Sequence, residues 1–494
     1  MFCSATRVKV PPALQPRKDA HMRITMFSIN PLYPNVITGG ASKHLRSVAI
    51  HLGELGHHVR IMCTRIEGSD TRFLWHPNVE VHPVLPFKQP FPQPYAISGH
   101  DMAQVVQLMG DALHDADRFY VHDGELLFPF LSERVPTVVS LRDNVYPETL
   151  HGGFLFRGHR LILISEYSRK FVLATMGRFF PALRERIVVI HNGIDWDTFR
   201  PTPPRDILSV IPVDPTKHKI VIHPHRPEES KGLLQTIAVA DLLVHRCGWD
   251  TLRVLAPKWL ESQNTPELLD FYARVQADID RRGLTEHVIF HDWVPSALMP
   301  EYYAMGDVSL SLGSFAETFG NSVYESLGCG TPAVVARVTT HRELLPPDLI
   351  DTVDYADTEA AAALVDDILR TGRRTSQATL DYLRTHYGVQ RQLDAYANVI
   401  LNAEHSTPLI YRHPVLNDDT LFGLAPWCVP SVRGVYHDFN ATYADMGALG
   451  RLLIAQRAGI SRRQARESGI AAAEFDHWFE AGYIVPNSDA FIDE

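Results

Sequence analysis

The sequence is poor in cysteine and has no long apolar run. Its 494 residues include five scattered cysteines, at positions 3, 63, 247, 329 and 428, and no C-x-x-C pair. This odd number and spacing indicate neither a disulfide framework nor a zinc site. No stretch approaches the roughly 18 to 20 apolar residues that span a bilayer, and no signal-peptide core precedes the first expected strand. We expect a cytoplasmic protein, and we keep peripheral contact with the inner membrane face as an alternative.

Basic residues are too few for a protein that coats nucleic acid. Lys and Arg number 47 against 57 Asp and Glu, and the formal net charge is -10. Proteins that coat nucleic acid carry a basic footprint, so nucleic acid is not an expected partner. With 45% hydrophobic and 21% charged residues, the composition is that of an ordinary globular protein. At about 150 residues per domain, the length predicts two or three domains.

Short apolar strands alternate with helical stretches along most of the chain, which is typical of a parallel sheet covered by helices. The expected strands of the first half are 23–29, 58–63, 118–122, 137–141, 160–165 and 187–191, with a helix over 41–55. The alternation resumes with strands at 219–224, 251–256, 287–291 and 307–312. The predicted fold class is α/β, with two doubly wound Rossmann-like domains facing a cleft. Ligands of such sheets bind at the carboxyl ends of the strands.

These patterns divide the chain into four parts. Residues 1–21 show no periodicity and are predicted to be a disordered leader or to reflect an upstream start. Residues 22–203 and 204–404 form the two Rossmann-like domains, joined through a proline-rich linker. Residues 405–494 are predicted to form a small, mainly helical module of winged-helix character. Its role is open between a helical cap or oligomerisation module and a module that recruits a peptide or protein partner; nucleic acid ranks last because the chain is acidic.

Two glutamates lie eight residues apart in the stretch SFAETFGNSVYESLGCGTP, residues 314–332. Glu317 precedes a Phe-Gly turn, and Glu325 lies one turn into the helix that follows. Because carboxylates repel an anion, we expect the pair to bind hydroxyl groups of a sugar or a ribose. The alternative is that both glutamates only complement the positive end of the helix.

The same stretch predicts an anion pocket at the start of that helix. We expect Asn321 or Ser322 to cap the helix. The backbone N–H groups of Phe319 to Ser322 would then point outward and favour a phosphate. Gly320 would let a ligand approach the backbone closely.

Two further segments offer groups suited to phosphate. In HPHRPEESKG, residues 223–232, Arg226 and Lys231 follow an expected strand and could stabilise a diphosphate leaving group without a metal. The alternative is a pair of solvated surface charges. Gly39 and Gly40 precede the first helix and form a second phosphate-compatible turn, although paired glycines are most often ordinary turn residues.

Taken together, these motifs resemble the family 4 retaining glycosyltransferases. The resemblance covers about residues 23–403. The matching segments are the E-x7-E stretch at 317–325 with GCGTPAVVA and Glu343 after it, R-x4-K at 226–231, NGIDWDTFRP at 192–201, LISEYSR at 163–169 and the Gly-Gly loop with the first helix.

The resemblance implies a reaction and a fold. The fold would be the GT-B type, with residues 22–203 as the acceptor domain and residues 204–404 as the nucleotide-sugar domain. The chain would move a hexose-type sugar from a nucleotide diphosphate sugar to an unidentified acceptor hydroxyl, with retention of configuration. No divalent metal and no other cofactor would be needed. The departing phosphate would accept the proton of the acceptor, which agrees with the absence of a convincing nucleophile and base pair in the sequence.

The resemblance also assigns roles to the residues named above. Glu317 would contact the transferred sugar, and Glu325 would hold the ribose hydroxyls. Arg226 and Lys231 would hold the diphosphate. The loop at Gly39 and Gly40 and the N–H groups of residues 319–322 would assist them.

The chain departs from the family pattern at three positions. Arg142 stands where the family often has a histidine that positions the sugar and the acceptor; Arg142 could instead bind a phosphate or an anionic acceptor. His225 and His291 replace glycines and would narrow the donor pocket. The D-x-D sequence at 195–197 lies in the NGID segment, so we expect no metal there.

Two other functions stay open at this stage. An epimerase of the same architecture would bind a sugar nucleotide without an acceptor, and a non-catalytic sensor would bind one and signal through the C-terminal module. The E-x7-E pair together with Arg226 and Lys231 favours transfer over both. Residues 168–186 mix basic and large apolar side chains, which fits membrane contact or, as the simpler alternative, an ordinary amphipathic core helix.

Overall fold

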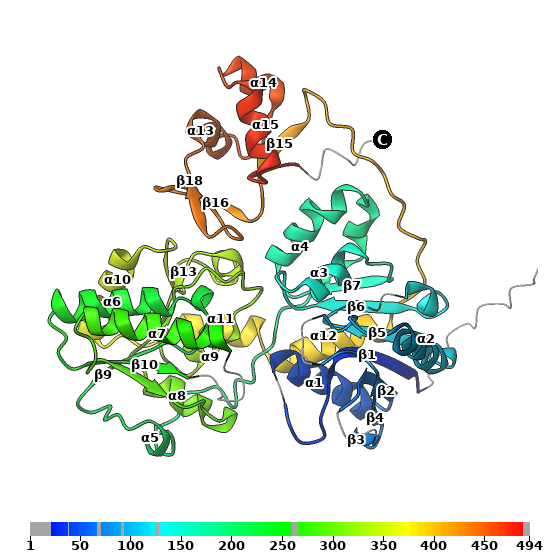
Figure 1. The fold of residues 1–494 in the computed structure, drawn as a ribbon, viewed down its shortest axis with the longest axis horizontal. Helices are drawn as coiled ribbons and strands as arrows, with labels where there is room; N and C mark the ends of the chain where they lie inside the picture. The colour runs from blue at the N-terminus through cyan, green and yellow to red at the C-terminus, as the bar shows by residue number, and fades with distance from the viewer. Residues whose placement is uncertain are drawn as a thin grey trace, which may run out of the picture.

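The computed structural model describes residues 21–37, 39–66, 71–89, 93–124, 126, 128–258 and 265–487. The leader predicted over 1–21 therefore lies outside the described residues, except for its last residue. The described chain forms two α/β domains with a small C-terminal module across them (Figure 1). In this part of the chain, none of the helices has the length and apolar character that a bilayer crossing requires.

The first domain is built on an eight-stranded sheet in the order β3-β4-β2-β1-β5-β6-β7-β8, in which only β3 is antiparallel to its neighbour. The strands are β1 (Arg23–Pro31), β2 (His58–Thr64), β3 (Phe73–His76), β4 (Val79–Leu85), β5 (Arg118–His122), β6 (Thr137–Leu141), β7 (Arg160–Leu163) and β8 (Ile187–Val189). The helices are α1 (Gly40–Glu54), α2 (Gly99–His114), η1 (Pro129–Ser132), α3 (Pro147–Phe154), α4 (Glu166–Ala174), η2 (Met176–Arg178) and η3 (Pro181–Glu185).

Burial explains why these segments form a covered parallel sheet. All five residues of β5 and all five of β6 are buried, as expected for strands covered on both faces. Helix α1 buries Leu45, Val48, Ala49 and Leu52, which share one face at helical spacing. The domain has one apolar core on each side of its sheet.

The second domain has a six-stranded parallel sheet in the order β11-β10-β9-β12-β13-β14. The strands are β9 (Lys219–Ile222), β10 (Leu252–Pro257), β11 (Val288–His291), β12 (Val308–Ser311), β13 (Ala333–Ala336) and β14 (Asp351–Val353). The helices are α5 (Ile207–Val210), η4 (Glu229–Lys231), α6 (Leu233–His245), α7 (Pro266–Arg281), η6 (Ser296–Leu298), α8 (Met299–Met305), α9 (Asn321–Gly328), η7 (Thr339–Arg342), α10 (Thr358–Thr371) and α11 (Gln377–His386). The predicted fold class, two Rossmann-like domains, is confirmed.

Helix α12 (Val389–Leu401) returns from the second domain to the first. Tyr396, Ala397 and Ile400 are buried in the core that α1 forms with the first sheet, and the Tyr396 hydroxyl lies 3.0 Å from Ser140 Oγ of β6. Figure 1 shows this yellow helix beside α1. The division of the chain at residue 404 therefore does not follow the packing, because the last helix of the predicted second domain covers the first sheet.

The C-terminal module contains strands as well as helices. Its elements are β15 (Leu421–Leu424), β16 (Cys428–Ser431), β17 (Gly434–His437), β18 (Thr442–Ala444), α13 (Gly447–Ala455), β19 (Ile460–Ser461), α14 (Arg462–Glu467), α15 (Ala472–Glu480) and β20 (Ile484–Pro486). They include two three-stranded sheets, β19-β15-β20 and β16-β17-β18. The helices of the predicted module are present, and its strands went unpredicted because segments of two to four residues are too short for alternation to reveal them.

The three arginines of α14 are paired within the module. Arg463 forms an ion pair with Asp419 at 2.8 Å, and Arg466 pairs with Asp418 at 2.6 Å. Arg462 lies 2.9 Å from Asp476. These carboxylates offset the basic charge that a nucleic-acid surface would need.

The apolar side chains that suggested membrane contact over 168–186 are covered by protein. Phe171 of α4 contacts the rings of Trp427 and Phe439 in the C-terminal module. Phe179 stacks on Tyr411, with ring centroids 6.0 Å apart. The mixed pattern of this segment therefore has an explanation within the fold.

The packing of α12 predicts which domain a mutation in it will loosen. Ile400→Ala should destabilise the protein by about 2–5 kcal/mol, because a fully buried side chain would leave a cavity. Hydrogen exchange should rise in α1 and not in α9. The exposed Asn398→Ala is the matched control, expected within about 0.5 kcal/mol of the parent. Faster exchange in α9 instead would contradict the assignment of α12 to the first domain.

Candidate functional site

The site residues of the second domain gather where its strand order reverses. The chain passes from β9 to β10 and β11 on one side, then crosses to β12 on the other side of β9. Strands β9 and β12 pair in parallel, so their carboxyl ends lie side by side. Arg226 and Lys231 follow β9, and Glu317 follows β12. A crevice at such a reversal is the usual ligand position in an open α/β sheet.

Two glycines allow the loops after β9 and β12 to touch. A Cβ on Gly232 would lie 2.4 Å from Gly313 N, and a Cβ on Gly313 would lie 2.1 Å from Ser230 O. Gly232 also has φ +87°, in the region that favours glycine. The Phe315 N–H donates to Ser230 O at 3.0 Å. Only glycine permits this backbone approach, which places the two loops against each other.

Lys231 and Glu317 form an ion pair at this crossing. Lys231 Nζ lies 2.6 Å from Glu317 Oε1, and the two side chains are 10% and 23% exposed. The ammonium also lies 3.3 Å from the centroid of the Phe315 ring, which attracts a cation. The two residues predicted from separate motifs thus share one site.

Arg226 lies at the boundary with the first domain. Its Nη2 is 3.0 Å from Glu228 Oε1 and 3.4 Å from the hydroxyl of Tyr146, the residue before α3. The side chain is 39% exposed, so it lies at the domain boundary and outside either core.

Glu325 occupies a more enclosed position one turn into α9. The Tyr303 hydroxyl donates to Glu325 Oε2 at 3.1 Å. Burial raises the pKa of Glu325, while this hydrogen bond and the positive charge of Lys43 act to lower it. Lys43 belongs to α1, so the first turn of α1 faces Glu325 across the domain boundary.

The start of α9 differs from the sequence prediction. The residue before the helix is Gly320, which has φ +81°, and no side chain caps the helix. Asn321 and Ser322 are its first two residues, so the prediction that either one caps the helix was wrong. Asn321 Oδ1 instead accepts from Asn192 Nδ2 at 3.0 Å. Because the chain enters the helix through a left-handed glycine, the N–H groups of the first turn are left without a side-chain cap.

His341 lies at the candidate site, although the sequence motifs did not indicate it. A Cβ on Gly320 would lie 2.5 Å from His341 Cε1, so the imidazole packs directly under the start of α9. Burial lowers the pKa of His341 to about 4, which keeps it neutral at pH 7. Its Nδ1 lies 3.3 Å from the Tyr324 hydroxyl. Only the fold brings His341 to this position, since no local pattern joins it to Gly320.

Gly39 immediately precedes α1, as predicted, and Gly40 is the first residue of the helix instead of preceding it. Both are exposed, and a Cβ on either would meet no atom within 4 Å. The Gly39 N–H donates to Ser42 Oγ at 3.1 Å. The charge of nearby Lys43 acts to lower the pKa of Glu325 in the second domain. The Gly-Gly turn therefore lies on the side of the first domain that faces α9, and its phosphate contact stays a prediction.

Arg142 belongs to a hydrogen-bonded bridge between the domains. Its Nη2 donates to Asn192 Oδ1 at 2.7 Å, and Asn192 in turn donates to Asn321 of α9. The Thr318 hydroxyl donates to the Arg142 carbonyl at 2.6 Å. Arg142 Nη1 is buried and has no hydrogen-bond partner among the described residues. The residue thus links strand β6 to the start of α9, and its proposed contact with an anion stays a prediction.

A buried acid lies beside Arg142. Asp123 Oδ1 accepts from the Arg142 backbone N–H at 2.9 Å. Burial, followed by the negative charge of Asp143, raises the pKa of Asp123 to about 7. This acid follows β5, the strand next to β1 at the order reversal of the first sheet, so it lies at the corresponding ligand edge.

The two histidines that replace family glycines have different surroundings. His225 is buried at the site, with Nε2 3.1 Å from Leu310 O and Nδ1 3.5 Å from Ser322 Oγ. Burial lowers its pKa to about 3. His291 instead lies 3.2 Å from the hydroxyl of Tyr302. Of the two, only His225 contacts a predicted site residue directly.

The D-x-D sequence forms a turn. Asp195 accepts from the N–H groups of Asp197 and Thr198, and the Thr198 hydroxyl donates to its Oδ2 at 2.6 Å. Across the described residues, no three His, Cys, Asp or Glu side chains come together as a metal site would require.

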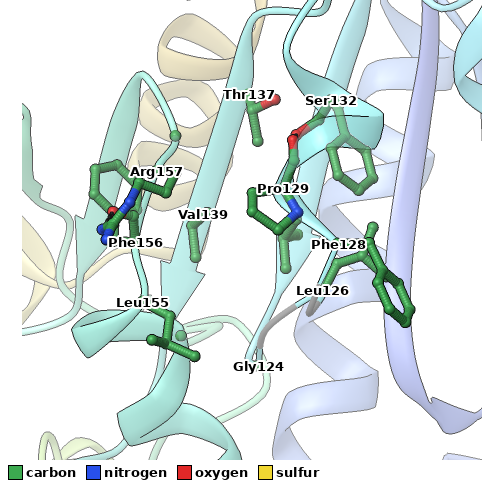
Figure 2. A pocket seen from close by; sticks show the side chains of 14 residues that line it. Gly124, Leu126, Phe128, Pro129, Ser132, Thr137, Val139, Leu155, Phe156 and Arg157 are labelled. Atoms are coloured by element: carbon green, nitrogen blue, oxygen red, sulfur yellow. Dashed lines mark hydrogen bonds between the residues drawn. The ribbon is translucent and has the colours of Figure 1, made fainter. Parts of the chain in front are cut away.

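A separate cavity of about 200 Å³ lies within the first domain. Figure 2 shows Leu126, Phe128 and Pro129 on one side of it, Leu155 and Phe156 on the other, and β6 between them. Its lining is mainly apolar, and the predicted phosphate-binding residues do not contribute to it. This cavity is unsuited to a diphosphate.

Two family models match the chain. The model described as Glycosyltransferase Family 4 matches residues 38–198, and the model described as Glycosyl transferases group 1 matches residues 205–379. A curated relative, the D-inositol 3-phosphate glycosyltransferase of Mycobacterium sp. (strain JLS), is 26% identical over 197 residues. That match covers 38% of this chain and 41% of the relative, so the chain spans about two fifths of that relative's length.

Solved structures share the fold at low sequence identity. A glycosyltransferase from Rickettsia africae has a TM-score of 0.60 and 15% identity, over 78% of this chain and 100% of that one. The sucrose-phosphate synthase of Thermosynechococcus elongatus gives 0.59 and 14%, over 77% and 98%. Anabaena HepE, solved with UDP and glucose, gives 0.58 and 18%, over 77% and 100%. At such identities the likeness concerns the fold alone, which is the GT-B type.

Because Glu325 is enclosed, we expect a variant that lacks its negative charge to be more stable than the parent protein at high pH. A raised folded pKa means that the native chain binds more protons than the unfolded chain, so stability falls as pH rises from the unfolded value through the folded one. Glu325→Gln keeps an acceptor for Tyr303 and removes the charge. We expect its melting temperature to exceed the parent's by about 2 °C at pH 8, with a smaller difference at pH 5.

The exposed Glu286→Gln is the control for this prediction, and its melting temperature should follow that of the parent at both pH values. A Glu325→Gln variant that melts below the parent at pH 8 would show that the carboxylate stabilises the free protein.

Proposed function

We propose that this chain, which belongs to the glycosyltransferases of the family 4 type, moves a hexose-type sugar from a nucleotide diphosphate sugar to an acceptor hydroxyl. We further propose that transfer retains the anomeric configuration and needs no divalent metal. The observation that carries the proposal is the Lys231–Glu317 ion pair at the strand reversal, beside the uncapped start of α9.

The charges around the site suit a diphosphate next to a sugar. Arg226 and Lys231 offer two cations at the end of β9, and the first turn of α9 adds backbone N–H donors and the positive end of a helix dipole. Both kinds of donor stabilise the negative charge that develops on a departing nucleoside diphosphate. Such fixed cations can take the place that a metal ion has in other transferases.

The two carboxylates would bind different hydroxyl groups of the donor. In the free protein Glu317 neutralises Lys231. When the donor binds, its phosphate would replace Glu317 as the partner of Lys231. The Glu317 carboxylate would then accept hydrogen bonds from sugar hydroxyls. Glu325 lies further into the pocket beside Tyr303, where it would accept from the ribose hydroxyls.

The proposed step breaks the bond between the anomeric carbon and the phosphate oxygen. The acceptor oxygen forms the new bond on the same face of the sugar, and the acceptor proton passes to the departing phosphate oxygen. The nucleoside diphosphate leaves with the electron pair of the broken bond. No enzyme nucleophile is required in this scheme, which suits a Glu317 that is held in an ion pair.

The donor class that we propose rests on solved structures of similar fold, and the proposed acceptor path rests on the positions of Gly40 and Arg142. Anabaena HepE was solved with UDP-glucose, and an E. coli protein of similar fold was bound to UDP-2-fluoro glucose, so UDP-hexoses are the first donors to test. The acceptor would enter from the first domain, past Gly40 and Arg142. The Arg142 Nη1 group, which has no hydrogen-bond partner among the described residues, would suit an acceptor that carries a negative charge.

The proposal predicts the effect of removing either charged partner. Lys231→Ala and Glu317→Ala should each lower kcat/KM for the donor at least about 100-fold, since each removes a group that acts on the transition state. Lys219→Ala is the matched control. Lys219 is the first residue of β9, at the end of the strand away from the site, and it pairs with Asp307. It should keep kcat/KM within about threefold of the parent.

The assay is a panel of UDP-, GDP-, ADP- and dTDP-sugars with nucleotide release and the product sugar both analysed. Slow release of one nucleotide without acceptor would identify the donor. An altered sugar on an intact nucleotide would indicate epimerisation. Binding without turnover, with or without acceptors, would indicate a sensor. Near-parental turnover in Lys231→Ala or Glu317→Ala would refute the site assignment.

Metal independence is tested separately. Turnover should be unchanged, within about twofold, when the protein is assayed in excess EDTA instead of Mg²⁺ or Mn²⁺, because Arg226 and Lys231 supply the cationic charge. Loss of turnover in EDTA that Mg²⁺ restores would contradict this part of the proposal.

A further inference from the structure

One buried carboxylate of the C-terminal module contacts both α/β domains. Asp438 follows β17, and its side chain is fully buried. Arg342 of η7 donates to it through Nη1 and Nη2, at 2.8 and 2.7 Å. The hydroxyl of Tyr167, in α4 of the first domain, donates to Asp438 Oδ2 at 2.9 Å. The Thr339 N–H, also in η7, donates to Oδ1 at 3.1 Å. A buried carboxylate needs such donors, and here they come from two domains.

The η7 segment that Asp438 holds also supports the candidate site. The Thr339 hydroxyl donates to the backbone carbonyl of Glu317 at 2.6 Å. His341, two residues further on, packs under Gly320 at the start of α9. Two successive hydrogen bonds therefore connect Asp438 to the backbone of Glu317.

The backbone at Thr339 shows that this segment is held under constraint. Thr339 is fully buried and has φ +43°, a conformation that a β-branched residue rarely adopts. Strain of this kind persists only when surrounding contacts determine the conformation. The contacts at Thr339 are the bond from its N–H to Asp438 and the bond from its hydroxyl to Glu317.

Apolar contacts fasten the module to each domain independently of Asp438. On the first domain, Phe171 of α4 packs against Trp427. On the second, Tyr436 is buried against Ala336 and Val338, between β13 and η7. Figure 1 shows the module placed over α4 on one side and β13 on the other. Relative movement of the domains would break contacts on one side or the other.

We propose that the C-terminal module clamps the two domains, and that Asp438 is a positioning residue for sugar transfer that acts through Thr339 on Glu317. The second part rests on the function proposed for Glu317. Lys231 contacts Glu317 and the Phe315 ring, and Glu325 contacts Tyr303, so donor binding should depend on Asp438 far less than the chemical step does.

The first test removes the link nearest the site. Thr339→Val keeps the shape and branching of the side chain and removes the hydroxyl that donates to Glu317. We expect kcat to fall about tenfold or more while KM for the UDP-hexose changes less than about threefold. Thr339→Ser restores the hydroxyl and should recover most of kcat. A parental kcat in Thr339→Val would overturn the positioning role.

The second test asks whether Asp438 acts through the same link. Asp438→Asn should lower kcat with little change in KM, and the double variant with Thr339→Val should be no slower than the slower single variant, because residues acting through one path are not additive. Ser431→Ala is the control: Ser431 joins the module to Asp354 at 2.6 Å and has no bond to η7, so kcat should stay parental. Independent, multiplying losses would overturn the proposed path.

Hydrogen exchange provides a readout that needs no activity. In Asp438→Asn, amide exchange should rise in 314–325 and in α4, and Ser431→Ala should leave both segments unchanged. Unchanged exchange at both segments in Asp438→Asn would overturn the clamp. Because this readout is independent of turnover, failure of the clamp is distinguishable from failure of the proposed transferase, which the Lys231 variant reports by itself.

Discussion

The backbone of Gly232 runs against the backbone of Gly313, and the positions of the charged groups at the site depend on that contact. Any side chain at either residue would push the loops after β9 and β12 apart. With the loops in contact, Lys231 reaches Glu317 and both remain largely enclosed. The same requirement for glycine recurs at Gly320, where His341 fills the space that a Cβ would need. The site is therefore determined first by close backbone approach and only then by charge.

Polar bridges between the domains surround this centre. Arg142 and Asn192 connect the first domain to Asn321, and Arg226 reaches Tyr146. The C-terminal module adds Asp438, which contacts both domains behind the Glu317 loop. Buried polar groups contribute orientation more reliably than stability, because their interactions are offset by desolvation. These bonds fix the position of one domain relative to the other at the candidate site.

Sequence reasoning predicted the parts of this structure that local pattern determines. Alternating apolar strands indicated both Rossmann-like domains, and the spacing from Glu317 to Glu325 placed one carboxylate before a helix and one within it. The positions that escaped prediction depend on contacts distant in sequence. Nothing near His341 indicates that it lies under Gly320, and nothing near residue 400 indicates that α12 covers the first sheet. The strands of the C-terminal module are too short to produce a readable alternation, and the cap of α9 depends on a left-handed glycine.

The central claim is that the cations after β9 and the start of α9 form a diphosphate site. Its most direct test is a calorimetric comparison of the nucleoside diphosphate that the chain prefers with the parent nucleoside. Charge-assisted hydrogen bonds contribute roughly 1.5–3 kcal/mol each. With at least two cations engaged, we expect the diphosphate to bind about 100-fold more tightly or better. Equal affinities for the nucleoside and the nucleoside diphosphate would contradict the account, because they would mean that Arg226, Lys231 and α9 do not bind the phosphates.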